Sequence, residues 1–241
     1  MIEHNVKILS TRPLSPSLVE EAAALGIVLD RLSFIETTPL DSEELRGKIG
    51  DLFHTSLVAV FTSMNAVDAV AGDRRKAGET GIVPWKVFCI GSATRQHVLE
   101  SFGAGLITGT ADSAAALADQ ILLQKDIRQV VFFCGDQRRD ELPEKLQQGG
   151  VAVQELVVYT TVRTPHRVEQ PYEGIAFFSP SAVHSYFSNN TPPAATILFA
   201  IGQTTADAIR NYSGNTLLIS DSPDKEALIR QAIGYFRAGT K

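Results

Sequence analysis

The chain contains an internal repeat whose segments occur in rotated order in its two copies. FTSMNAV (61–67) resembles FFSPSAV (177–183), and VFCIGSAT (87–94) resembles LFAIGQTT (198–205). A second set matches the other way: ILS (8–10) with GIVLDRLSFIET (26–37) resembles FFC (132–134) with GVAVQELVVYTT (150–161). Ser10 precedes Ile27 by 17 positions, and Cys134 precedes Val151 by the same 17. This pattern requires two similar domains, one of them assembled from both ends of the chain.

The order of the repeated segments predicts where the domains begin and end. Residues 39–161 hold one complete set and form an inserted domain, whereas residues 1–35 and 170–241 together form a discontinuous domain. The chain therefore crosses between them twice, at residues 36–38 and 162–169. Both crossings are rich in Thr and Pro, and we expect them to pair as a two-stranded β linker. A cleft between two such domains is the default place for a ligand.

Short apolar runs alternate with helical segments along all 241 residues, a length suited to two compact domains. Runs that are continuously apolar indicate parallel strands covered by helices on both faces. The fold class predicted is therefore α/β, with parallel sheets flanked by helices in both domains. We expect strands at 6–10, 27–35, 57–63, 86–91, 129–135, 174–179 and 196–202. We expect helices at 16–25, 64–77, 92–101, 112–124, 138–148, 181–188, 203–212 and 223–236.

Charge and composition exclude several classes of protein. The 22 Lys and Arg against 27 Asp and Glu give a net charge of −5, which argues against binding to nucleic acid or a membrane surface. No apolar run is long enough to span a membrane, and the N-terminus lacks the pattern of a signal peptide. Cys89 and Cys134 lie in apolar runs and are interpreted as buried thiols. A soluble, cytoplasmic protein is expected.

Motifs for nucleotides and metals are missing from the sequence. There is no GxGxxG fingerprint, no GxxxxGK[ST] loop, no GxSxG elbow and no HExxH, and the five histidines show no ligand spacing. No cofactor and no metal site are therefore expected.

Small polar residues follow several predicted strands at the point where a helix begins. In parallel α/β sheets these strand ends face the ligand crevice. Helix starts bind carboxylates or phosphates because their backbone N–H groups are free and the helix dipole is positive there. The alternative is plain helix capping, which Ser, Thr and Asn perform in most proteins. The candidate substrate-binding residues of this kind are Ser63, Asn65, Thr94, Ser179, Ser181, Thr204 and Thr205.

Two arginines and one tyrosine complete the candidate site. Arg12 follows the first strand at a turn set by Thr11 and Pro13, and Arg138 follows the strand that ends in CGD. Either could bind an anionic ligand, with surface solvation as the alternative. Tyr159 ends the strand VVYTT, where its hydroxyl could reach a cleft and donate a proton. A tyrosine packed at a domain edge is the alternative.

These motifs together resemble the uroporphyrinogen-III synthase family. The resemblance rests on FTSMNAV, FFSPSAV, AIGQTTADAI, the GxxRRDxL stretch at 135–142 and VVYTT, and it runs from Arg12 to the SPDKEAL segment. It implies two similar α/β domains joined by a two-stranded linker. It also implies a cofactor-free hydro-lyase of haem biosynthesis, which converts hydroxymethylbilane into uroporphyrinogen III with inversion of ring D. A monomer that can receive its substrate from hydroxymethylbilane synthase is implied as well.

The resemblance assigns roles to particular residues. Tyr159 would assist departure of the substrate hydroxyl or steady a spiro intermediate, while Ser63, Ser181, Thr94 and Thr205 would contact substrate carboxylates. Two positions depart from the family pattern. Asn65 offers an amide where relatives often carry a basic residue, and Ile197 stands where some relatives place a Lys. A charge-based role at these two positions is therefore in doubt.

Two other functions fit the same residues. One is a non-catalytic, two-lobed binding protein that closes on an anionic ligand. The other is a regulatory or interaction domain that has kept the fold without the activity. Turnover separates these alternatives from an enzyme, since neither has a reaction to lose.

Overall fold

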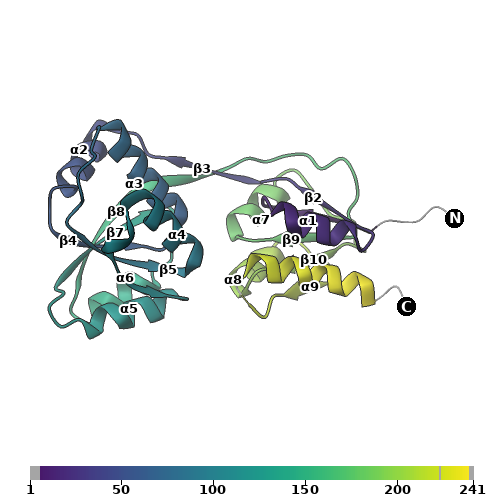
Figure 1. Cartoon of the computed structure of the whole chain (residues 1–241). Coiled ribbons are helices and arrows are strands. Elements are labelled where there is room, and N and C mark those ends of the chain that lie inside the picture. Colours follow the sequence, from purple (N-terminus) through teal and green to yellow (C-terminus); the bar gives the residue numbers. More distant parts are fainter. Residues whose placement is uncertain (1–5, 223, 239–241) are drawn as a thin grey trace. The chain divides into compact units, whose positions relative to one another are not determined.

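The computed structural model describes residues 6–222 and 224–238. The chain divides into two units (Figure 1). Unit 1 comprises the chain up to Glu36 together with the chain from Val162 onward, and unit 2 comprises Thr37–Thr161. Each unit is built around its own sheet, in which most neighbouring strands are parallel.

The larger sheet has the strand order β3-β8-β7-β4-β5-β6. Its strands are β3 (Ile35–Pro39), β4 (Leu57–Phe61), β5 (Trp85–Ile90), β6 (Ile107–Ala111), β7 (Gln129–Gly135) and β8 (Ala152–Arg163). The helices of unit 2 are α2 (Glu43–Leu52), α3 (Met64–Lys76), α4 (Gly91–Phe102), α5 (Ala114–Leu123) and α6 (Glu141–Gln148), with a short 3₁₀ turn η1 (Ala104–Leu106).

Alternating strand residues divide the core of unit 2 between the two faces of the sheet. Phe61 and Phe133 point to the face covered by α2, α3 and α4, and their rings stack with centroids 5.0 Å apart. Val60 and Phe132 point to the opposite face, which α5 and α6 cover. Both faces are buried, which explains why these strands are continuously apolar in the sequence.

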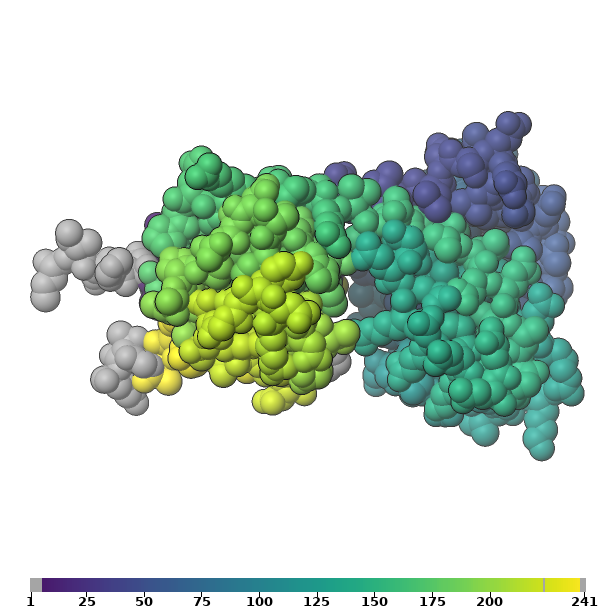
Figure 2. Space-filling view, turned by 180° about the vertical axis from the view of Figure 1, so that it is seen from behind, coloured from purple at the N-terminus to yellow at the C-terminus, as the bar shows by residue number. Residues whose placement is uncertain are grey.

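The smaller sheet, in unit 1, has the order β11-β10-β9-β1-β2. Its strands are β1 (Val6–Ser10), β2 (Ile27–Arg31), β9 (Gly174–Phe177), β10 (Ile197–Ala200) and β11 (Leu217–Ile219). Helices α7 (Pro180–Phe187) and α8 (Gln203–Arg210) pack on one face, and α1 (Pro16–Ala23) and α9 (Lys225–Ala238) on the other. Figure 2 shows the C-terminal part of the chain, in yellow, at the surface of this unit.

The two sheets share one strand order, as the rotated repeat predicts. The order β11-β10-β9-β1-β2 in unit 1 corresponds to β6-β5-β4-β7-β8 in unit 2, and neighbouring strands within both series pair in parallel. Unit 1 reaches this order only by combining strands from both ends of the chain. The predicted fold class, with one discontinuous domain, is confirmed.

The two crossings pair with each other, which confirms the expected two-stranded linker. The backbone N–H of Leu40 donates to the carbonyl of Val158 at 2.9 Å, and that of Thr164 donates to Phe34 at 3.0 Å. Phe34 thus pairs with Thr164, and Leu40 with Val158. Because the residue numbers rise along one strand as they fall along the other, β3 and β8 run antiparallel. The inter-domain linkers expected from the sequence, residues 36–38 and 162–169, remain predictions.

Some predicted elements differ from the structure in their bounds, and some elements were missed. Residues 27–35 do not form one strand, because the Ser33 hydroxyl donates to the carbonyl of Ile35 at 2.6 Å and Phe34 turns fully into the core. The helix expected from residue 138 begins at Glu141. Helix α2 and strands β6 and β11 were not predicted as elements, since β6 reads ITGTA and lacks an apolar run. The expected helix start at Pro223 lies outside the described residues.

Candidate active site at the carboxyl ends of the strands

Tyr159 and Ser63 meet at the carboxyl end of the sheet in unit 2. The Tyr159 hydroxyl donates to Ser63 Oγ at 3.2 Å, across 96 positions of sequence. Both residues are half-buried, and the Tyr159 side chain packs against the core. Tyr159 does not end its strand as predicted, because β8 continues to Arg163. Its hydrogen-bonded phenol can donate a proton to a bound ligand.

A close approach of the chain to itself places the Tyr159 ring. The parallel register of β7 and β8 shifts by one residue at this point. Cys134 pairs with Val157, but the next residue, Gly135, pairs with Tyr159, so that Val158 of β8 is skipped. A Cβ atom on Gly135 would lie 2.5 Å from Cζ, 2.6 Å from Cε2 and 2.8 Å from Oη of Tyr159. The ring therefore occupies space that only glycine leaves empty.

Ser63 and Ser179 cap corresponding helices in the two units. Ser63 Oγ accepts from the N–H of Asn65 at 3.2 Å at the start of α3, and Ser179 Oγ accepts from Ala182 at 3.2 Å at the start of α7. The capping alternative considered above is thus realised at both serines. Asn65 and Ser181 are half-buried residues in the first turns of the same two helices.

Helices α4 and α8, which follow the Ile-Gly pairs at 90–91 and 201–202, begin without a serine cap. In the described part of the chain, no side chain caps the start of α4 or of α8. Gly91 adopts a φ of +70°, a conformation that favours glycine at the turn into α4. Thr94 and Thr205 are both buried in the first turns, and Thr204 is exposed. Uncapped N–H groups at such helix starts are available to an anion.

Arg12 is placed by its neighbours, at the end of β1. Thr11 is buried and donates its hydroxyl to the carbonyl of Ala176 at 2.8 Å, while Ser10 Oγ donates to the carbonyl of Arg12 at 2.7 Å. Burial lowers the pKa of the Arg12 guanidinium from its usual value, although arginine remains charged at every physiological pH.

Lys225 is a second cation close to Arg12, and the sequence analysis missed it. Its pKa is lowered, first because the surrounding protein disfavours the charge and second because the charge of Arg12 is near. Lys225 stands in SPDKEAL, where the sequence suggested only a helix start. No local motif marks Lys225, because Arg12, the cation near it, lies more than two hundred positions away in the sequence.

Arg138 is occupied by two carboxylates. Its Nε donates to Glu155 and its Nη1 to Asp140, and these bonds raise the pKa of the guanidinium. The positive charge that the sequence offered for a ligand is therefore balanced within unit 2.

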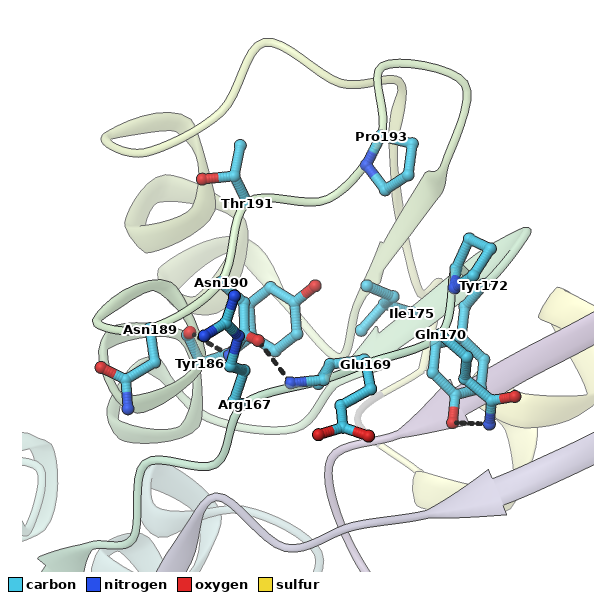
Figure 3. A pocket seen from close by; sticks show the side chains of 12 residues that line it. Arg167, Glu169, Gln170, Tyr172, Ile175, Tyr186, Asn189, Asn190, Thr191 and Pro193 are labelled. Atoms are coloured by element: carbon cyan, nitrogen blue, oxygen red, sulfur yellow. Dashed lines mark hydrogen bonds between the residues drawn. The ribbon is translucent and has the colours of Figure 1, made fainter.

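A pocket of about 300 Å³ lies elsewhere in unit 1, lined by segments that lead into β9 and β10 (Figure 3). Several of its polar side chains bond to one another or to the backbone. Tyr172 donates to Asp30 at 2.7 Å, Gln170 donates to the Tyr172 hydroxyl at 2.8 Å, and Asn190 accepts from Val168 at 2.7 Å. The pocket holds none of the residues that the sequence singled out, and these bonds brace the loops around it.

Residues 6–222 and 224–238 contain neither a candidate metal site nor a helix that could span a membrane. There, no group of three or more His, Cys, Asp or Glu side chains is arranged to hold a metal ion. The helices described are too short or too polar to cross a membrane.

The fold and the candidate site define a class of protein: two α/β units whose strand ends present helix starts, hydroxyls and cations suited to a small anionic molecule. Comparison with known proteins gives the particular family. Residues 16–230 match the family described as uroporphyrinogen-III synthase HemD, so the chain belongs to that family. It is therefore an enzyme, a hydro-lyase of tetrapyrrole biosynthesis that acts on a small molecule.

Individual relatives agree with this assignment. The chain is 25% identical to the uroporphyrinogen-III synthase of Saccharomyces cerevisiae over 219 residues, covering 78% of this chain and 80% of the yeast protein. Two solved structures share the fold. A mutant uroporphyrinogen III synthase from Thermus thermophilus aligns with a TM-score of 0.63 at 18% identity, covering 98% of this chain and 99% of the other. The uroporphyrinogen-III synthetase of Helicobacter pylori aligns with a TM-score of 0.66 at 16% identity, covering 95% and 99%. Nothing in these findings supports the binding-protein alternative.

Proposed function

We propose that Tyr159 is the catalytic residue with which this enzyme closes hydroxymethylbilane to uroporphyrinogen III. The supporting observation is the hydroxyl of Tyr159, bonded to Ser63 at 3.2 Å at the carboxyl end of a parallel sheet. Such a hydroxyl can turn from Ser63 to a bound substrate with little movement of its ring.

The proposed chemistry begins with loss of water. Tyr159 donates its proton to the hydroxyl group on ring A as the C–O bond breaks, and the pyrrole nitrogen, which keeps its N–H, supplies the electron pair that completes an azafulvenium cation. The substituted carbon of ring D attacks this electrophile and forms a spiro intermediate. Fragmentation and recombination invert ring D, and the proton then lost from the ring returns to the phenolate. The reaction releases one water and needs no external oxidant or reductant.

Orientation accounts for most of the catalysis in this proposal. The substrate loses its hydroxyl readily, so the protein mainly has to hold the conformation in which the substituted carbon of ring D is attacked. Well-oriented reactions gain up to about 7–11 kcal/mol in model systems. A protein of net charge −5 can still hold the eight carboxylates of this substrate if backbone N–H groups and local cations meet them.

We assign binding of the substrate carboxylates to the helix starts and to the two cations Arg12 and Lys225. The proposed residues are Arg12, Lys225, Ser63, Asn65, Thr94, Ser179, Ser181, Thr204 and Thr205. Arg138, the remaining sequence candidate, has the weakest support because Glu155 and Asp140 already pair with it.

The cellular setting is also a proposal. Cys89 and Cys134 are both free and buried, which suits a reducing compartment such as the cytoplasm. We propose that the enzyme works there as a monomer, without a cofactor, and accepts its unstable substrate from hydroxymethylbilane synthase.

A coupled assay tests the proposal. Hydroxymethylbilane is supplied to the purified protein, the products are oxidised to porphyrins, and isomers III and I are separated by chromatography. We expect isomer III from the wild type and a large loss of it in Tyr159→Phe. Tyr212→Phe is the matched control, because Tyr212 is exposed and bonds only to His184 among the described groups. Wild-type rates in Tyr159→Phe would remove the phenol from the mechanism.

A further inference from the structure

We infer that Asp136 is a positioning residue for the reaction, because its carboxylate holds the backbone from which the Tyr159 phenol projects. The inference rests on the proposed role of Tyr159 and adds a residue that neither the sequence motifs nor the comparisons indicate. It stands on hydrogen bonds within unit 2.

Asp136 is bonded to three consecutive residues of β8. Its backbone N–H donates to the carbonyl of Tyr159 at 3.1 Å. Its Oδ2 accepts from the Thr160 hydroxyl at 2.9 Å, and its Oδ1 accepts from the Thr161 N–H at 2.9 Å. One short side chain therefore takes over the pairing of β8 at the point where the regular ladder with β7 ends.

This point needs a side-chain partner. Strand β7 ends at Gly135, whereas β8 continues to Arg163, so the residues beyond Tyr159 have no further β7 backbone to pair with. The register shift opposite Gly135 disturbs the ladder just before this end. A bulge increases local twist and re-aims side chains. Strand β3 pairs with the other edge of β8. On the β7 side, loss of the Asp136 carboxylate would leave Thr160 without its side-chain bond and, among the described groups, would leave Thr161 with only the bond from Gln137 Nε2 to its carbonyl, at 3.2 Å.

The phenol is sensitive to such a twist because it is held closely on both sides. Its ring lies against the backbone of Gly135, and its hydroxyl meets Ser63. Misplacement of a reacting group by about 1 Å can cost roughly 100-fold in rate. Asp136 itself is exposed, so its replacement leaves no cavity in the core.

The test compares Asp136→Ala with Asp136→Asn. The alanine variant loses both acceptor oxygens, and we expect kcat to fall roughly 10- to 100-fold with little change in KM. The asparagine variant keeps one oxygen for the Thr161 N–H and offers its NH₂ group to the Thr160 hydroxyl. It should recover most of the rate. Asp126→Ala is the matched control, because Asp126 is an exposed aspartate of the same unit that pairs with Lys86 and should leave kcat unchanged.

A double-mutant cycle separates this inference from the proposed role of Tyr159. If Asp136 acts through the phenol, Asp136→Ala should cost no further rate once Tyr159 is already Phe. Additive losses, an equal loss in Asp136→Asn, or a change in KM alone would overturn the inference while leaving Tyr159 catalytic. A fully active Tyr159→Phe variant would instead refute the proposed function.

Discussion

Replacing Gly135 with alanine should reduce turnover by displacing the Tyr159 ring. The new Cβ would lie 2.5 Å from Cζ, whereas ordinary contacts begin near 3.4 Å, so the ring has to retreat by about 0.9 Å. The backbone φ of Gly135 lies outside the left-handed region, so alanine causes no backbone strain. The effect therefore comes from the ring alone.

The magnitude follows from this displacement. A shift of about 0.9 Å is large enough to break the 3.2 Å bond to Ser63 and to misplace the proton donor. We expect kcat to fall roughly 100-fold. Overpacking usually costs about 1–3 kcal/mol of stability, and the half-buried ring should keep the cost near the lower figure. The melting temperature should then fall by only a few degrees.

The assay is the chromatographic measurement of isomer III, run well below the melting temperature of each variant. Gly105→Ala is the matched control, because a Cβ at Gly105 meets nothing within 4 Å. In a Tyr159→Phe background the ring is still displaced, but the hydroxyl is already gone, so Gly135→Ala should add no further loss. Wild-type kcat in Gly135→Ala, or an equal loss in Gly105→Ala, would refute the reasoning.

Three further predictions concern charge, a thiol and a helix. Lys225→Met should raise KM roughly 2- to 5-fold without lowering kcat, as expected for loss of an exposed ion pair with a substrate carboxylate. Because the folded-state pKa of Lys225 is lowered, its charge opposes folding below that pKa. Unfolding in urea should therefore show the variant to be slightly more stable at neutral pH, with the difference vanishing as pH rises. Burial raises the pKa of Cys134 from 9.0 to about 11, so its stabilising contribution should fade from about pH 9 upward, and Ellman's reagent should react with it at pH 8 only after unfolding. Gly47→Ala, in the exposed middle of α2 with nothing within 4 Å, should stabilise unit 2 by about 0.5–1 kcal/mol in urea titrations.

The repeat made the fold predictable in unusual detail. Matching segments at 61–67 and 177–183, and at 87–94 and 198–205, contain strand ends followed by helix starts, and their strands occupy equivalent places in the two sheets. The elements that were missed, α2, β6 and β11, lie outside the matched segments. Strand β6 is polar and short, and the break after β2 depends on the Ser33 hydroxyl and on the burial of Phe34. Neither feature produces a periodic pattern in the sequence.

The sequence could predict which types of residue belong to the candidate site, but it could not predict which of them contact one another. Ser63 and Tyr159 stood out separately as a helix start and a strand end, yet their hydrogen bond spans 96 positions and has no local signal. Lys225 was missed for the same reason. Arg138 was chosen for its place after β7, but the pattern could not reveal that Glu155 on the neighbouring strand would neutralise it.

The repeat also explains why the two units should contribute differently to the reaction. When segments 8–10 and 26–37 are aligned with 132–134 and 150–161, Arg12 occupies the repeat position equivalent to Asp136, and Ile35 the position equivalent to Tyr159. The same turn thus carries a cation in unit 1, near a second cation at Lys225, and carries the acid that holds the phenol segment in unit 2. Substitutions at Arg12 should therefore act mainly on KM, because they remove a group that binds carboxylates. Substitutions at Tyr159, Gly135 and Asp136 should act mainly on kcat, because they remove or misplace the proton donor. Steady-state kinetics on Arg12→Ala and Tyr159→Phe would show this division directly, and a fall in kcat alone for Arg12→Ala would contradict it.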